Sequence, residues 1–197
     1  MVPTRLFDAI TYQFEQFPKK DMLVHKKEGK WTPISSEEVR NRANKIGAGL
    51  LAMGMSAGDF TPEGADKIAI ISENRPEWII TDLAVQQIGA ILVPLYPTTP
   101  LEEVAYNLEE AEVKLVFISN QLLLNKYKAT LTNIPSIKEI FSFDPTEQPS
   151  WEIVAAKANP ESRQELERRK AEISADHTAT IIYTSGTTGK PKGVMLS

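Results

Sequence analysis

The sequence lacks cysteine altogether and contains only two histidines among its 197 residues. Disulfides and thiolate metal sites are therefore excluded, and the absence fits a reducing compartment. No apolar run approaches the ~20 residues that cross a membrane. The first residues also lack the apolar segment of a signal peptide. These absences lead us to expect a cytoplasmic protein.

An excess of positive charge is also missing. Lysine and arginine number 22 against 26 aspartates and glutamates, which gives a net charge of −4. Nucleic-acid-binding proteins usually carry a basic face, so we expect no nucleic-acid partner. Hydrophobic residues make up 42% of the chain and charged residues 24%, as in an ordinary globular protein. The length suffices for one sizeable core or a domain and a half.

What the sequence does contain is a short stretch, residues 183–193, that is rich in glycine, hydroxyl groups and lysine. Glycine lets the backbone come close to a ligand. Amide groups, hydroxyls and ammonium groups can together surround the oxygens of a polyphosphate. The candidate phosphate-binding residues are Thr184, Ser185, Gly186, Thr187, Thr188, Gly189, Lys190, Pro191, Lys192 and Gly193.

This stretch is not a Walker loop. Such a loop has four residues between its first glycine and the Gly-Lys pair, and Ser or Thr follows the lysine. Here two threonines separate Gly186 from Gly189, and Pro191 follows Lys190. Residues 179–183 are predicted to form a buried strand and residues 194–196 another, so the loop should lie between two strands. The alternative interpretation is a surface hairpin turn of similar composition.

From residue 66 onward, short apolar strands alternate with amphipathic helices. The expected strands lie at residues 67–72, 90–95, 114–118, 137–143 and 179–183. The helices between them are expected to begin with caps at Asn74, Thr99, Ser119 and Asn159. This alternation is typical of a parallel sheet whose two faces are both covered. We predict an α/β fold, with a doubly wound, mostly parallel sheet and helices on both faces.

The N-terminal part has a different pattern. We expect a helix at 5–16 capped by Thr4, a hairpin of strands at 22–24 and 31–34, and a helix at 35–53. The chain should therefore divide into a helix–hairpin–helix segment at 1–60 and a βαβ subdomain at 66–197. Five lysines in and before the hairpin fit either a solvated turn or contact with an anionic membrane surface. They are Lys19, Lys20, Lys26, Lys27 and Lys30.

The expected fold also places the site. Ligands of doubly wound sheets bind beyond the carboxyl ends of the strands, and the loop after residue 183 lies at such an end. Residues 96–100 follow another strand and look like a rigid loop at its carboxyl end. Other polar residues are weaker candidates: His177 is typical of a loop histidine, and Glu73, Glu77 and Asp82 are expected to be solvated surface carboxylates.

Residues 184–194 resemble the phosphate-binding signature of the adenylate-forming (AMP-binding) superfamily, which includes acyl-CoA synthetases, luciferases and peptide-synthetase adenylation domains. Residues 70–78 and 87–97 look like the N-terminal half of long-chain fatty acid–CoA ligases. The resemblance covers essentially the whole chain. It implies the N-terminal part of the large domain found in acyl-CoA synthetases and luciferases. It also implies that residues 96–100 lie near the active-site cleft and line the site.

The resemblance also implies a two-step reaction. A fatty acid carboxylate attacks the α-phosphate of ATP and releases pyrophosphate, and the thiol of coenzyme A then displaces AMP. The loop would surround the leaving β- and γ-phosphates, where cations and N–H donors stabilise the developing charge. Lys192 is the candidate catalytic cation, and Lys190 is less constrained. Mg²⁺ is implied as well, but no metal ligand can be assigned in this sequence.

Members of this superfamily continue for several hundred residues beyond the signature. We therefore expect this chain to be a fragment without synthetase activity of its own, since a phosphate loop alone cannot position an acyl carboxylate. Residues 1–60 are expected to pack on later segments, so in the fragment their apolar faces are expected to be exposed, repacked or paired in a dimer. Two alternatives stay open: an adenylating enzyme for another carboxylate, or a stand-alone phosphate-binding or interaction module.

Overall fold

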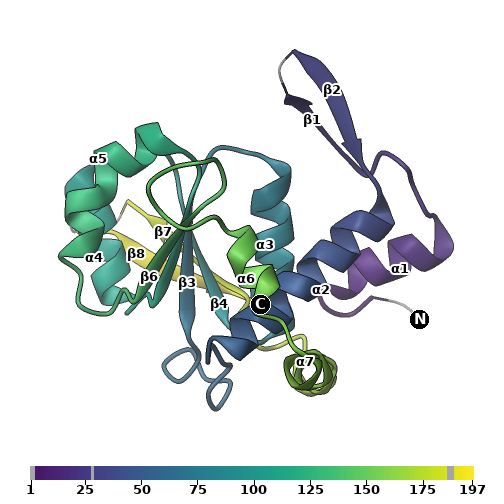
Figure 1. The fold of residues 1–197 in the computed structure, drawn as a ribbon. Coiled ribbons are helices and arrows are strands. Elements are labelled where there is room, and N and C mark those ends of the chain that lie inside the picture. The colour runs from purple at the N-terminus through teal and green to yellow at the C-terminus, as the bar shows by residue number, and fades with distance from the viewer. Residues whose placement is uncertain (1–2, 28, 186–188) are drawn as a thin grey trace.

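The computed structural model describes residues 3–27, 29–185 and 189–197, and its centre is a six-stranded sheet (Figure 1). The strand order is β6-β5-β3-β4-β7-β8. In chain order the strands are β3 (Lys67–Ile71), β4 (Ile91–Leu95), β5 (Leu115–Ile118), β6 (Glu139–Ser142), β7 (Thr180–Thr184) and β8 (Lys192–Leu196). All neighbours pair in parallel except β7 and β8, which are antiparallel. The predicted mostly parallel sheet is therefore confirmed.

Helices cover both faces of this sheet, because alternate side chains of each inner strand point to opposite sides. In β3, Ile68 and Ile70 belong to one buried cluster, and Ala69 and Ile71 belong to the other. The helices that follow β3 are α3 (Pro76–Gln87), α4 (Leu101–Glu110), α5 (Gln121–Thr132), α6 (Glu152–Ala156) and α7 (Pro160–Glu172). Figure 1 shows α4 and α5 on one side of the sheet and α3 and α6 on the other.

The N-terminal segment consists of α1 (Asp8–Gln16), β1 (Leu23–Lys27), β2 (Lys30–Ile34) and α2 (Ser36–Ala52). Ser35 caps α2 as predicted, because its side chain accepts a 3.1 Å hydrogen bond from the backbone N–H of Glu38. Helix α2 packs on α3, α6 and α7, and its Ile46 and Leu50 lie in the cluster beside Ile68 and Ile70. The β1–β2 hairpin stands away from the rest of the protein (Figure 1).

Four predicted N-cap residues are wrong by one to three positions, and in α4 Pro100 takes the place of Thr99. Helix α1 begins at Asp8 with Phe7 as its N-cap, so Thr4 is not the cap. Arg75 precedes α3 in place of Asn74, because Pro76 fits the first helical position. Asn120 caps α5 in place of Ser119, accepting a 3.0 Å hydrogen bond from the N–H of Leu123.

The predicted cap of α7 is confirmed. The Asn159 side chain accepts a 2.7 Å hydrogen bond from the N–H of Ser162, whose hydroxyl accepts one of 3.0 Å from the N–H of Asn159. Leu166 is buried, as expected of the main apolar residue in this charged helix. None of the helices in the described part of the chain combines the length and the hydropathy that a bilayer span requires.

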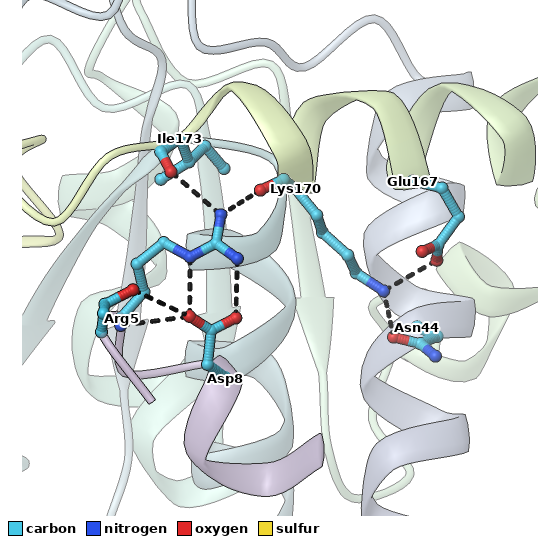
Figure 2. Close-up of polar contacts among 7 residues, drawn as sticks. Arg5, Asp8, Asn44, Glu167, Lys170 and Ile173 are labelled. Carbon is cyan, nitrogen blue, oxygen red and sulfur yellow. Dashed lines mark hydrogen bonds and ion pairs between the residues drawn. The ribbon is translucent and has the colours of Figure 1, made fainter. Parts of the chain in front are cut away.

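Polar contacts fasten the first residues to the end of α7 (Figure 2). Arg5 forms a 2.7 Å ion pair with Asp8 and donates to the backbone carbonyls of Lys170 and Ile173, the latter at 2.9 Å. The last carbonyls of a helix lack partners within it, so this guanidinium satisfies groups that would otherwise need water. Hydrogen bonding to Arg5 holds the pKa of Asp8 below its ordinary value.

Candidate functional site

The candidate loop joins β7 to β8 at the carboxyl end of β7, between two strands as predicted. Thr184 lies opposite Lys192 in the antiparallel register, and Tyr183 lies opposite Gly193. The two outermost candidate binding positions therefore belong to the strands, and the loop proper is residues 185–191. The predicted residues Gly186, Thr187 and Thr188 lie outside the described residues.

The prediction that residues 179–183 form a buried strand is wrong. Only Ile181 is buried in β7, whereas Ile182 is 36% exposed and Val194, opposite it in β8, is 42% exposed. Both strands are apolar in sequence, but β8 is the last strand in the sheet order and all five of its residues are exposed. Local pattern alone does not reveal which strand of a sheet lacks cover.

The described cationic groups of the loop are exposed. Within residues 3–27, 29–185 and 189–197, no carboxylate lies within 4.0 Å of the ammonium nitrogen of Lys190 or Lys192. Gly189 has a φ of +88° with open space around its Cα. Two lysines without carboxylate partners beside a left-handed glycine form an arrangement that can accept an anion.

A second loop lies at the same edge of the sheet. Strand β4 runs parallel to β7, so residues 96–100, which follow β4, lie beside the candidate loop. The Tyr127 hydroxyl fixes this segment by donating to the backbone carbonyls of Pro97 at 2.9 Å and Thr99 at 2.6 Å. Tyr96 is highly exposed there. The position agrees with the expectation that residues 96–100 line the site, which stays a prediction.

Helix α4 contacts the β7–β8 hairpin. The Tyr183 hydroxyl donates a hydrogen bond to Glu110, and the Lys190 ammonium lies 5.3 Å from the centre of the Tyr106 ring. Two causes raise the pKa of Tyr183: burial, which is the larger, and the contact with Glu110. The Tyr183 hydroxyl therefore stays protonated and can donate. Neither Tyr106 nor Glu110 was predicted from the sequence to lie at the site. Their spacing of four residues on a predicted helix was the available signal, because it places both on one helical face.

Two carboxylates predicted to be solvated are engaged in the fold. Arg75 forms 2.8 Å ion pairs with Glu77 and with Asp144. The pair with Asp144 joins the segment that follows β3 to the segment that follows β6. Asp82 is partly buried, and this burial raises its pKa to about 6, although the 2.7 Å hydrogen bond that it accepts from Gln86 acts in the opposite direction. The predictions for Glu77 and Asp82 are wrong because neighbouring elements cover this helix.

A cavity of about 340 Å³ lies at the opposite, amino edge of the sheet, near Ala90 and Ala179. His177 lines it, stacks on the Phe60 ring at 4.6 Å and accepts a 3.2 Å hydrogen bond from the N–H of Ser174. These contacts fit the loop role predicted for His177. No group of three or more metal-binding side chains gathers within the described ranges.

Comparison with known proteins links this geometry to a family. The model of the family described as AMP-binding enzyme matches residues 10–197. The long-chain-fatty-acid–CoA ligase FadD15 of Mycobacterium bovis is 28% identical over 96% of this chain and 30% of its own length. Human long-chain-fatty-acid–CoA ligase 6 is 32% identical over 83% of this chain and 24% of its own length. The chain thus spans less than a third of these relatives.

Solved structures agree at the level of the fold. A long-chain-fatty-acid–CoA ligase from Archaeoglobus fulgidus superimposes with a TM-score of 0.74 at 20% identity, covering all of this chain and 37% of that one. A red-emitting luciferase from Phrixothrix hirtus gives a TM-score of 0.75 at 17% identity, covering 98% of this chain and 44% of that one.

Proposed function

Because the chain belongs to the AMP-binding enzyme family, we propose that it is the phosphate-loop-bearing part of an ATP-dependent long-chain fatty acid–CoA ligase. One observation carries this proposal. The glycine-, hydroxyl- and lysine-rich loop lies at the carboxyl edge of a doubly wound sheet, where such folds bind ligands. Its described lysines are exposed and have no carboxylate partner among the described residues. The names of the curated relatives suggest the acyl substrate.

The loop would act on the first of two steps. In that step the carboxylate oxygen bonds to the α-phosphorus of ATP while the bond to the bridging oxygen of pyrophosphate breaks. Negative charge then grows on the departing pyrophosphate. Lys192, at the base of the loop, would stabilise that charge together with Lys190, the hydroxyls of Thr184 and Ser185, and the backbone amides. Coenzyme A thiol would displace AMP in the second step.

Magnesium would enter this chemistry with the nucleotide. Mg²⁺ in such sites is usually bound through substrate phosphates and only one or two carboxylates. When bound, it would offset charge on the phosphate oxygens, and we assign it no protein ligand.

Pyrophosphate binding tests the assignment of the loop. Calorimetry should detect weak binding of pyrophosphate or ATP to the unaltered chain. We expect Lys192→Ala to weaken it by about tenfold, because a hydrogen bond between charged groups contributes roughly 1.5–3 kcal/mol. Lys138→Ala, at an exposed lysine before β6, is the matched control and should bind normally. Equal binding by the Lys192→Ala chain would refute the assignment.

We also propose that the 197-residue chain alone makes no acyl-CoA. It spans only 30% of the FadD15 relative, and catalysis requires the carboxylate and the α-phosphate to be held together. A coupled assay with long-chain fatty acid, ATP, Mg²⁺ and coenzyme A should show no product above background. Sustained acyl-CoA formation by the purified chain would overturn this proposal.

The β1–β2 hairpin suits peripheral contact with an anionic membrane. Trp31 is 70% exposed and lies opposite Lys26, while Lys27 lies opposite Lys30. An exposed aromatic side chain flanked by lysines is typical of segments that bind a charged bilayer surface. The chain should sediment with phosphatidylserine vesicles more than with phosphatidylcholine vesicles, and Lys26→Glu combined with Lys30→Glu should abolish the difference. Binding that ignores both lipid charge and these substitutions would contradict the proposal.

Self-association is a separate proposal for the N-terminal segment. Leu6 and Phe17 are large apolar side chains that are more than half exposed. Exposed apolar surface of this kind favours burial against another copy. Gel filtration should show a larger apparent mass as the concentration rises. A monomer at all concentrations would argue against it.

A further inference from the structure

Two side chains of α4 touch the candidate loop region from one side. Glu110 accepts the hydrogen bond of Tyr183, in the strand that enters the loop. Tyr106 lies beneath the ammonium of Lys190, within the loop. The two residues are four apart, so they stand one above the other on the same face of the helix. One helical face therefore contacts the hairpin at two separate points.

The helix that supplies these contacts is fixed to the sheet. Val104 and Leu108, also on α4, are fully buried in the cluster that includes Ile181 of β7. Tyr106 and Glu110 therefore project from a helix that is anchored by the core. Lys190 is exposed, so α4 offers this side chain a fixed point of contact.

Glycine at 193 lets the two strands of the hairpin pack closely. Gly193 lies opposite Tyr183, and a Cβ atom at Gly193 would lie 3.4 Å from the ring carbon Cζ of Tyr183, an ordinary contact, and 2.8 Å from a methyl carbon of Ile181. The second distance is too short for real carbon atoms, so any larger residue would displace Ile181. The absent side chain at Gly193 thus keeps the buried Ile181, the neighbour of Tyr183 by two positions in β7, in its place.

Among the described residues, these contacts leave the Lys190 ammonium with no carboxylate within 4.0 Å. Glu110 is engaged by a phenol that burial keeps protonated. An ammonium group has three N–H donors. Lys190 can therefore donate to a phosphate oxygen while it stays over the Tyr106 ring, which holds it near the loop beforehand.

We propose that Tyr106 and Glu110 of α4 are positioning residues for the phosphate loop. Glu110 fixes the stem of the hairpin through Tyr183, and Tyr106 holds Lys190 at the mouth of the loop before an anion binds. This inference rests on the proposed function of the loop as a pyrophosphate site. Neither residue contacts the phosphate itself. Their effect is to reduce the side-chain and backbone ordering that binding requires.

The contact of Lys190 with Tyr106 can be tested without any ligand. Protons beside the face of an aromatic ring resonate upfield, so the ε-methylene signal of Lys190 should be shifted upfield in the NMR spectrum. Tyr106→Phe keeps the ring and should keep the shift, whereas Tyr106→Leu should lose it. An unshifted signal in the unaltered chain would overturn the role of Tyr106.

Pyrophosphate affinity, measured by calorimetry, tests whether the contacts matter for binding. We expect Tyr106→Leu to weaken pyrophosphate binding by about threefold, corresponding to the loss of one cation–π contact. Tyr106→Phe keeps the ring and should bind pyrophosphate as tightly as the unaltered chain. Glu110→Ala should weaken binding to a similar extent, and Glu110→Gln should retain it, because an amide oxygen can also accept the phenol hydrogen. Glu109→Ala, at the exposed neighbouring residue, is the matched control.

The outcomes separate this inference from the function on which it rests. If the unaltered chain binds pyrophosphate but all four α4 variants bind equally well, only the positioning role is refuted. If Tyr106→Phe binds pyrophosphate as weakly as Tyr106→Leu, or Glu110→Gln as weakly as Glu110→Ala, the loss reflects general destabilisation. The positioning role is then refuted as well. If the unaltered chain binds no pyrophosphate while the NMR shift is present, the proposed function fails and the positioning role with it. Thermal unfolding of each variant confirms that it is folded.

Discussion

The centre of the sheet and its β8 edge are built from similar apolar strands but meet different surroundings. Every residue of β3 and β5 is buried, because helices cover both faces of these strands. Every residue of β8 is exposed, and β7 is buried only at Ile181. The comparison shows that one sheet provides a rigid scaffold at its centre and an accessible loop near its edge. Binding loops commonly occupy such less buried parts of a fold.

The largest expected effect concerns the covered centre. Phe117 is fully buried in β5 and stacks with Phe141 and Phe143 at ring-centre distances of 5.6 and 6.0 Å. Phe117→Ala should lower the free energy of unfolding by about 4 kcal/mol, because it removes buried area and leaves a cavity. Urea unfolding followed by circular dichroism measures this loss. A loss below about 1 kcal/mol would mean that the centre is not the stable region.

A glycine in α2 should have the next largest effect. A Cβ atom at Gly49 would lie 1.8 Å from the backbone oxygen of Val154 in α6. Replacing glycine by alanine usually stabilises a helix, but Gly49→Ala should destabilise the protein by about 3 kcal/mol, because two backbones must separate. Thermal unfolding measures the loss.

Gly47→Ala in the same helix is the matched control. Its Cβ would approach a methyl group of Leu166 at 3.2 Å, and a side chain can move more easily than a backbone. The loss should therefore be clearly smaller than at Gly49. Equal losses at the two positions would contradict the proposed close contact of α2 with α6.

Asp82 should give a smaller effect that depends on pH. Burial raises its pKa from 3.8 to about 6, so the folded state binds its proton more tightly than the unfolded state. Its contribution is therefore most favourable at low pH and is lost as the pH rises through about 6. Asp82→Asn should stabilise the protein by about 1–2 kcal/mol near pH 7.5 and have little effect near pH 4. Urea unfolding at both pH values tests this, and a pH-independent difference would contradict it.

The smallest effect is expected at the uncovered edge. Val194→Thr replaces an exposed side chain of β8 by one of similar size and strand preference. The free energy of unfolding should change by less than about 0.5 kcal/mol. Chemical denaturation measures the change. A large loss would show that another surface covers this strand, for example in a self-associated form.

The alternation of strands and helices carried enough information to predict the sheet and the position of the loop. Strands such as β3 and β5 are continuously apolar because both of their faces are covered, and that pattern is local in sequence. The same pattern gave a wrong prediction of burial for β7, because Ile182 is equally apolar but belongs to a strand near the sheet edge. Cover depends on which elements are neighbours in space.

The site residues that lie in one continuous segment could be predicted from the sequence. Those that reach the site from a distant segment could not. The loop could be identified because its glycines, hydroxyls and lysines are consecutive. The contact of Tyr106 and Glu110 with the hairpin joins residues more than 70 positions apart. Asp82 was misjudged for a related reason, because its burial depends on helices that pack around α3.

Hydrogen–deuterium exchange with and without pyrophosphate tests the central claim most directly, namely that the exposed hairpin binds an anion while the covered centre stays unchanged. The account predicts slower exchange at the amides of Gly189, Lys190, Lys192 and Gly193 when pyrophosphate is added, and no change in β3 and β5. Protection instead around the cavity near Arg5 and His177, or no protection anywhere at saturating pyrophosphate, would contradict it.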